Sequence, residues 1–134
     1  MDGRLDFVTG VKYAPRPMEA GEAWIVDARG CDPHRLRSRE ALAALFGALV
    51  RDLGLRPVAP AAWHDFPGPG GITGFLLLSE SHVACHTFPE TGFAALDLYC
   101  CRRLGAWDWE AGLREHLGAR AVSVRRIPRG EGPR

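Results

Sequence analysis

Reactive side chains gather in residues 76–101, a segment that begins and ends in apolar runs. Its side chains with acid, base or nucleophilic chemistry include Glu80, Ser81, His82, His86 and Cys101. An apolar strand that stops on the letters SESH is more than a structural strand, because four reactive side-chain types converge on two neighbouring predicted strands. This segment is therefore the first candidate for a functional site.

A metal centre is one interpretation of this segment. His82, His86 and Glu90 recur at i, i+4 and i+8, which on a helix would place three ligands on one face. The β-branched residues of the segment and the ring of Pro89 disfavour a helix there. We therefore expect no metal site.

A cysteine–histidine nucleophile pair is a second interpretation. Cys101 paired with His86 would supply a thiol and the base that activates it. The pair requires adjacent strands, and the turn sequence at residues 89–92 predicts a hairpin that would bring them side by side.

Self-processing is a third interpretation. Ser81 would attack the carbonyl of Glu80 in an N-to-O acyl shift, and β-elimination of the ester would turn Ser81 into a pyruvoyl group. Such a ketone forms a Schiff base with a substrate amine and accepts the electrons left by loss of CO₂. The composition agrees, because the chain has 16 Arg but a single Lys, Lys12, in a stretch punctuated by Pro and Gly. A pyridoxal-phosphate enzyme needs a well-placed lysine.

Length and composition narrow the class of protein. With 134 residues, 46% hydrophobic and 25% charged, the chain fits one globular domain, residues 1–134. A net charge of +1 gives no reason to expect nucleic acid or a membrane surface as partner. The chain has neither a long apolar run nor the features of a signal peptide at residues 1–7, so we expect a cytoplasmic protein with free thiols.

Hydrophobic periodicity predicts two helices among several strands. Apolar residues at helical spacing indicate a helix at 38–53, ended by Gly54, and a second at 109–117, capped by Asp108 and stopped by Gly118. Asp32 followed by Pro33 is a helix-start signal. Strands are expected at residues 23–28, 55–63 (irregular or at an edge), 72–78, 82–88, 93–101 and 119–127. Residues 64–71 should be a loop, and residues 1–21 a poorly ordered extension.

This order predicts an α+β fold, a two-layer sandwich of a mainly antiparallel sheet with two helices on one face. In the strand at 93–101, alternation puts Asp97, Tyr99 and Cys101 on a common face. The sheet face away from the helices would be left open. It should pack against a second copy or form a site.

The core segment LSESHVACHTFPETGFAALDLYCC resembles the bacterial and archaeal S-adenosylmethionine decarboxylase proenzymes. The segments VDARGCDPHRL, HDFPGPGGITG and ARAVSVRRIPRG are similar to other parts of that family, so the resemblance covers about residues 24–130. It implies a proenzyme, or zymogen, that cleaves itself between Glu80 and Ser81 into a β chain (1–80) and an α chain (81–134), with a pyruvoyl cofactor made from Ser81.

The resemblance also implies roles for further residues. His86 and, in place of the usual serine, Thr73 would assist processing. Cys101 would be the acid that protonates the substrate after decarboxylation. Glu90 would accept the ribose hydroxyls of a small-molecule substrate, and Phe66 would stack on its adenine, with Phe88 nearby where the family more often has Trp.

The family resemblance implies a homodimer of αβ protomers and a place in spermidine and polyamine biosynthesis. The chain departs from the family pattern at Ala28-Arg29 and at Arg102-Arg103, beside the pocket. A shift to L-ornithine or L-arginine with the same chemistry is therefore an alternative, for which Asp97, Asp65 or Glu90 could bind the distal cation. An unprocessed, non-catalytic homologue is a second alternative.

Overall fold

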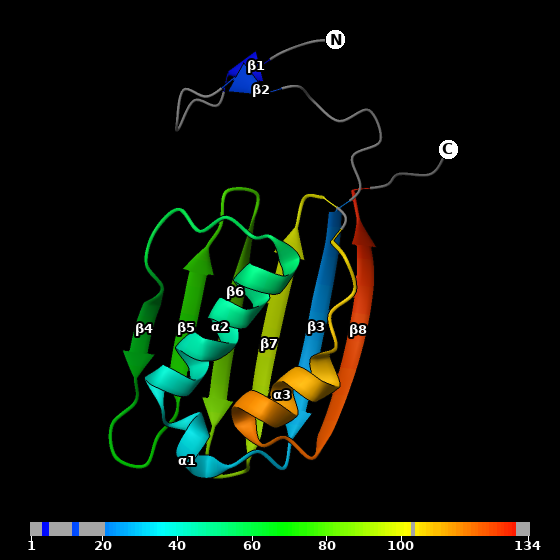
Figure 1. Cartoon of the computed structure of the whole chain (residues 1–134). Coiled ribbons are helices and arrows are strands. Elements are labelled where there is room, and N and C mark those ends of the chain that lie inside the picture. The colour runs from blue at the N-terminus through cyan, green and yellow to red at the C-terminus, as the bar shows by residue number, and fades with distance from the viewer. Residues whose placement is uncertain (1–3, 6–11, 14–20, 103, 131–134) are drawn as a thin grey trace.

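The computed structural model describes residues 4–5, 12–13, 21–102 and 104–130 (Figure 1). A six-stranded antiparallel sheet in the order β4-β5-β6-β7-β3-β8 forms one layer, and the helices form the other. The strands of this sheet are β3 (Gly21–Arg29), β4 (Ala62–Asp65), β5 (Ile72–Leu77), β6 (Ser81–Phe88), β7 (Phe93–Cys100) and β8 (Ala121–Arg129). The predicted α+β class with a mainly antiparallel sheet is confirmed.

In the part of the chain that the structure describes, three helices cover the same face of the sheet, where the sequence predicted two (Figure 1). The additional one is the short α1 (Pro33–Leu36), which starts where Asp32 accepts a hydrogen bond from the His34 amide. A four-residue helix is too short to show an apolar period, so only its cap was visible in the sequence. The two longer helices are α2 (Arg39–Leu53) and α3 (Trp109–Leu117).

Local signals set the ends of the two longer helices. The Ser38 side chain accepts a hydrogen bond from the Ala41 amide at the start of α2, and Gly54 ends that helix with φ 65°. Asp108 and Gly118 do the same for α3, as the sequence predicted. Glycine is favoured at a helix end where φ is positive, because other side chains clash there.

The hydrophobic core fills the space between the helices and the sheet. Leucines one turn apart on α2 and α3 meet the alternate residues of β5, β6 and β7 that point toward the helices. Fully buried members include Leu36, Leu42, Leu45, Leu49, Val83, Leu96, Leu98, Leu113 and Leu117. This core fixes the sheet as a rigid platform for the ends of its strands.

The irregular strand expected at 55–63 is wrong in its placement. Pro57 makes only an isolated bridge with Leu78, and the ladder with β5 starts at Ala62 and ends at Asp65. Pro57 and Pro60 have no amide hydrogen to donate, which keeps the segment before Ala62 out of the ladder. The predicted loop is shorter as a result, because its first two residues lie in the edge strand β4.

Two strands of the sheet differ from their predicted bounds, since the strand predicted at 23–28 is longer and the one predicted at 119–127 lies two residues further along the chain. β3 begins at Gly21 and β8 runs from Ala121 to Arg129, with Pro128 tolerated because β8 is an edge strand. Within the predicted N-terminal extension, β1 (Arg4–Leu5) and β2 (Lys12–Tyr13) pair with each other. The prediction of poor order for the rest of residues 1–20 lies outside the described residues.

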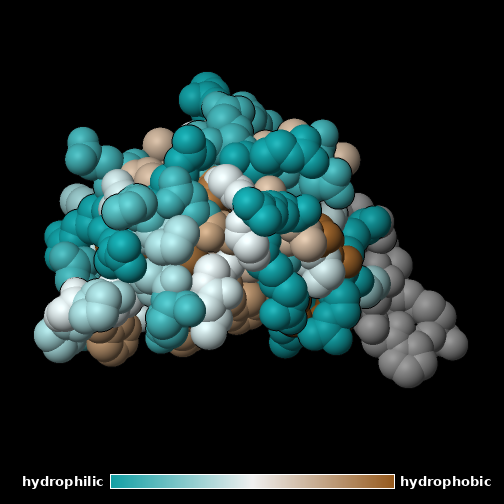
Figure 2. Space-filling view, turned by 90° about the horizontal axis from the view of Figure 1, so that it is seen from below, coloured by the Kyte–Doolittle hydropathy of each residue, from teal (hydrophilic) through white to brown (hydrophobic). Residues whose placement is uncertain are grey.

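The face of the sheet away from the helices carries exposed apolar side chains. Its exposed large side chains are Phe75, Leu77, Phe88 and Ile127, each between 38 and 48% accessible. Figure 2 looks at the lower end of the molecule and shows brown surface along the lower rim, away from the hydrophilic dome over the helices. Among the described residues, no helix is long and apolar enough to cross a membrane.

Candidate active site

The Glu80–Ser81 peptide lies in the tight turn that joins β5 to β6. The Leu78 amide donates a hydrogen bond to the Ser81 carbonyl oxygen over 3.0 Å, which closes the turn. Ser81 is the first residue of β6 and pairs with Cys100, the last residue of β7. The sheet ladder therefore holds the predicted cleavage point beside the end of β7.

The carbonyl group of Glu80 accepts a hydrogen bond from the backbone amide of Cys101 over 3.1 Å. This is the carbonyl that Ser81 would attack. A donor already aimed at an oxygen stabilises the negative charge that develops there during attack. The contact is a backbone one, so it does not depend on the Cys101 side chain.

Cys101 follows β7 directly, one residue beyond the observed end of that strand. It is partly exposed, whereas Cys31, Cys85 and Cys100 are buried. Burial raises the pKa of Cys31 to about 11 and that of Cys85 to about 12, the latter opposed by a backbone hydrogen bond from Gly74. Cys101 is thus the thiol with access to solvent and to small molecules.

Thr73 and His86 form a side-chain pair on the open face of the sheet. They are register partners on β5 and β6, and the Thr73 Oγ1 lies 3.1 Å from the His86 Nδ1. The contact with the hydroxyl fixes the orientation of the imidazole ring. A hydrogen-bond partner on one ring nitrogen also sets the protonation of the other nitrogen. The family resemblance implied a role in processing for both residues, and the structure places their side chains next to each other.

Within one protomer, however, His86 is remote from Ser81. His86 is five positions along β6 from Ser81, which corresponds to roughly 17 Å, and odd and even residues of a strand point to opposite faces. The Cys101–His86 nucleophile pair is not formed either, because His86 pairs with Ala95 across the hairpin and Cys101 lies roughly 20 Å further along. That interpretation is wrong for a single chain.

The predicted substrate-binding residues lie at the end of the sheet away from Ser81. Phe66 is half exposed in the β4–β5 loop, and its ring meets the edge of His64 with centroids 4.7 Å apart. Phe88 ends β6 and stacks on Phe93 at 5.7 Å. Glu90 is exposed in the β6–β7 turn. These residues share their end of the molecule with the Thr73–His86 pair.

The metal interpretation loses its geometric basis. His82 and His86 lie on the strand β6, where residues four apart are about 13 Å apart rather than one helical turn. The described residues contain no group of three or more His, Cys, Asp or Glu side chains that could hold a metal ion.

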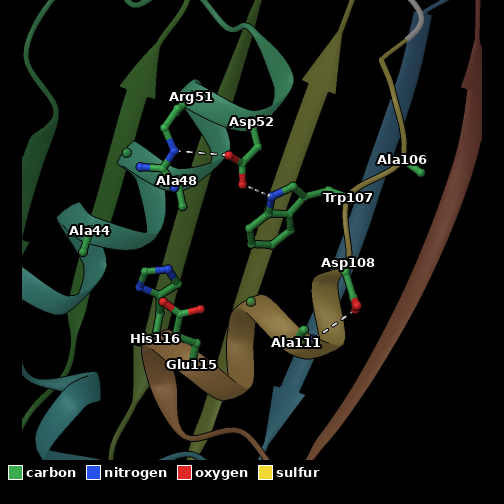
Figure 3. Close-up of a pocket in the computed structure, with 12 residues that line it drawn as sticks. Ala44, Ala48, Arg51, Asp52, Ala106, Trp107, Asp108, Ala111, Glu115 and His116 are labelled. Atoms are coloured by element: carbon green, nitrogen blue, oxygen red, sulfur yellow. Dashed lines mark hydrogen bonds and ion pairs between the residues drawn. The ribbon is translucent and has the colours of Figure 1, made fainter.

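A cavity of about 640 Å³ lies in the helical layer between α2 and α3 (Figure 3). Trp107 projects into it and donates an indole hydrogen bond to the Asp52 carboxylate over 2.9 Å, which lowers the pKa of Asp52. The ring needs Gly112 beneath it, since an added Cβ would lie 2.1 Å from it. None of the predicted site residues lines this cavity. The contacts of Trp107 with Asp52 and Gly112 anchor the segment that follows Cys101.

Tyr99 was not among the functional residues predicted from the sequence. It lies two residues before Cys101 on the open face, and its hydroxyl is hydrogen-bonded to the Cys101 side chain. The available signal was the i, i+2 spacing, which places both side chains on one face of an extended segment.

Comparison with known proteins identifies the family. The family model for S-adenosylmethionine decarboxylase matches residues 22–130. The S-adenosylmethionine decarboxylase proenzyme of Anoxybacillus flavithermus is 36% identical over 115 residues, covering 84% of this chain and 90% of its own length. Proenzyme 2 of Halalkalibacterium halodurans is 35% identical over 114 residues, covering 84% of this chain and 88% of its own length.

A solved structure gives the same fold. The crystal structure of the adenosylmethionine decarboxylase from Aquifex aeolicus matches with a TM-score of 0.69 and 24% identity, covering 86% of this chain and 94% of that chain. The family match and the relatives agree with the strand pairing, the turn and the side chains described above. All of them lead to one assignment. This chain belongs to the S-adenosylmethionine decarboxylase family.

Proposed function

We propose that this chain is a proenzyme that cleaves itself at Glu80–Ser81 and then decarboxylates S-adenosylmethionine, a step of spermidine and polyamine biosynthesis. The observation that supports cleavage most directly is the hydrogen bond from the Cys101 amide to the Glu80 carbonyl, 3.1 Å long, beside the Ser81 that would attack it. Family membership supports the substrate.

The geometry around Ser81 fits a pyruvoyl group made in place. Ser81 is partly exposed at the end of a strand, so a substrate amine can reach it, and the solvent-accessible thiol of Cys101 comes next to its strand partner Cys100. A pyruvoyl group supplies a carbonyl that condenses with the substrate amine and takes up the electron pair left behind when CO₂ departs. The protein groups supply the rest of the reaction.

Cys101 is the residue for returning a proton to the substrate. A thiol donates near neutral pH when its surroundings tune its pKa. The thiol loses its proton and becomes a thiolate, while the substrate carbon that lost CO₂ gains a C–H bond. The role requires solvent access, which Cys101 has and the buried Cys100 lacks.

A homodimer would complete the site. The cleavage residues lie at one end of the sheet, and the Thr73–His86 pair with Phe66, Phe88 and Glu90 lies toward the other. A two-fold pairing of open faces, with the strands running in opposite directions, would set the Ser81 end of one protomer against the His86 end of its partner. It would also cover the apolar side chains of the open face that are otherwise exposed to water.

The two departures from the family pattern have structural explanations where the structure describes them. Ala28 is fully buried in the core, and the neighbouring Arg29 guanidinium lies over the Phe93 ring at 5.0 Å. Arg102 donates to the Gly54 carbonyl oxygen over 2.9 Å and so caps α2, while Arg103 lies outside the described residues. These contacts give no reason to change the substrate.

The alternative substrates L-ornithine and L-arginine need a carboxylate for their distal cation. Asp65, one candidate, already pairs with Arg39 of α2 at 3.0 Å. Asp97 and Glu90 are exposed, the first within β7 and the second in the turn that precedes it. The family match and the curated relatives, rather than the placement of these carboxylates, favour S-adenosylmethionine as the substrate.

Two measurements test the proposal. The intact mass of the purified protein should show two chains that divide between Glu80 and Ser81. Labelled CO₂ should be released from S-adenosylmethionine and not from L-ornithine or L-arginine. A stable single chain without decarboxylation would reject the enzyme function, and release from ornithine or arginine alone would reject the substrate.

A further inference from the structure

The Tyr99 side chain packs into space that is open only because Gly21 has no side chain. A Cβ built on Gly21 would lie 2.9 Å from the Tyr99 hydroxyl oxygen and 2.9 Å from the Cys100 carbonyl oxygen. Both distances are shorter than real Cβ contacts, so alanine at this position would displace the phenol or the strand. Gly21 thus lets the ring of Tyr99 lie against the start of β3.

Rings and a cation hold Tyr99 from both sides on the open face. The His82 ring, on the register partner in β6, has its centroid 6.1 Å from that of Tyr99. The Arg129 guanidinium of β8 lies over the Tyr99 ring, 5.4 Å from its centroid. Phe75 in turn stacks on His82 at 5.7 Å. The phenol is therefore fixed by neighbours on several strands rather than free to rotate.

The hydroxyl of Tyr99 makes its hydrogen bond with the side chain of Cys101. Burial raises the pKa of Tyr99, and the negative charge of a neighbouring Cys101 thiolate raises it further, while Arg129 lowers it. A phenol with a raised pKa keeps its proton and remains a donor. Its O–H is then available to a sulfur that carries negative charge.

We propose that Tyr99 is the positioning residue of Cys101, holding the thiol at the cleavage end and stabilising the thiolate that remains after proton donation. The inference rests on the proposed function of Cys101. In that step the S–H bond breaks, a C–H bond forms on the substrate carbon, and sulfur keeps the electron pair. The Tyr99 O–H donates to that electron pair without losing its own proton.

The pH dependence of Cys101 alkylation tests this role without requiring decarboxylation. Iodoacetamide reacts with the thiolate, so its rate follows the thiolate fraction. We would measure the rate at Cys101 by peptide mass spectrometry in the uncleaved full-length Ser81→Ala chain, with and without Tyr99→Phe. Among the described residues, the charged or titratable groups that act on the phenol are Arg129, His82, Cys100 and Cys101, and all stay in place.

Loss of the hydroxyl should raise the midpoint of the alkylation profile by about one pH unit, a tenfold loss of thiolate at a given pH. Gly21→Ala, which displaces the phenol without removing it, should shift the midpoint in the same direction. Phe75→Leu changes the same ring stack one step further away and should leave the midpoint unchanged. Buried Cys31 and Cys85 report on folding, because both stay unreactive at pH 8 in a folded chain.

An unchanged midpoint in Tyr99→Phe with Cys31 and Cys85 still protected would overturn the inference. If Tyr99→Phe exposes those cysteines, the Gly21→Ala profile decides in the same way. In the cleaved protein, Tyr99→Phe should lower kcat about tenfold with little change in KM. A shifted midpoint in a protein that releases no CO₂ would reject the proposed function and keep the thiol–phenol pair, so the two failures are distinguishable.

Discussion

The two ends of β6 carry different reactive groups. At its start, Ser81 follows a carbonyl group already hydrogen-bonded by the Cys101 amide. Toward its other end, His86 has its ring fixed by Thr73 on the open face. Under the proposed function, one end would present the bond to be broken and the other would present a base. A strand is too rigid to bend one end onto the other, so the proposal requires that the two ends come from different protomers.

Removal of the Ser81 hydroxyl should have the largest effect at the cleavage end. Ser81→Ala leaves the chain without a nucleophile and without a source for the pyruvoyl group. A denaturing gel should show one uncleaved chain, and CO₂ release should fall to background. Cleavage at the same bond in this variant would contradict the account of processing.

Cys101→Ala should separate processing from turnover. Cleavage should proceed, because the backbone amide that contacts the Glu80 carbonyl is retained. Turnover should fall by about 10²–10⁴-fold, the usual contribution of a positioned general acid. The ratio of cleaved to uncleaved chain and kcat are the two measurements. The buried neighbour provides a control, since Cys100→Ala should have little effect on proton donation.

Glu90→Gln should sharpen the assignment of substrate binding to the His86 end. Replacing an ionised acceptor with an amide weakens hydrogen bonds to the ribose hydroxyls, and we expect KM for S-adenosylmethionine to rise about tenfold. The rate of cleavage and kcat should change little. An effect on cleavage with KM unchanged would move Glu90 from substrate binding to processing.

Thr73 should give the smallest effect. Thr73→Val keeps the shape but removes the hydroxyl 3.1 Å from the His86 Nδ1, so cleavage should slow about fivefold, as expected for one hydrogen bond of about 1 kcal/mol. Thr73→Ser keeps the hydroxyl and should match the wild-type rate within about twofold. The time course of chain cleavage measures both. Equal rates for the two variants would show that the hydroxyl does not act through His86.

Much of the fold followed from short-range signals in the sequence. Asp108 and Gly118 bound α3 at the predicted residues, and Gly54 ends α2 as expected, because caps are local and depend on few residues. The β6–β7 turn was predicted from Pro89 and Gly92 for the same reason. The displaced β4 was less predictable, since its start depends on which residues can donate to β5.

The separation of Cys101 from His86 was implicit in that same turn. Counting back from the pairing of Phe88 with Phe93 gives His86 opposite Ala95, which places Cys101 far along the strand. The contact between Tyr99 and Gly21 could not be predicted in this way. It depends on how β3 and β7 are paired, and these strands are far apart in the sequence.

Co-expression of two inactive variants tests the joining of the two ends most directly. A Ser81→Ala chain keeps His86 but cannot be cut, and a His86→Ala chain keeps Ser81 but lacks the base. We predict that mixed dimers cleave the His86→Ala chain, seen by mass spectrometry as an α chain that carries this substitution, while each variant expressed alone remains largely uncleaved. If the mixed dimers form and neither chain is cleaved, His86 does not act across the interface, and the account of the site is wrong.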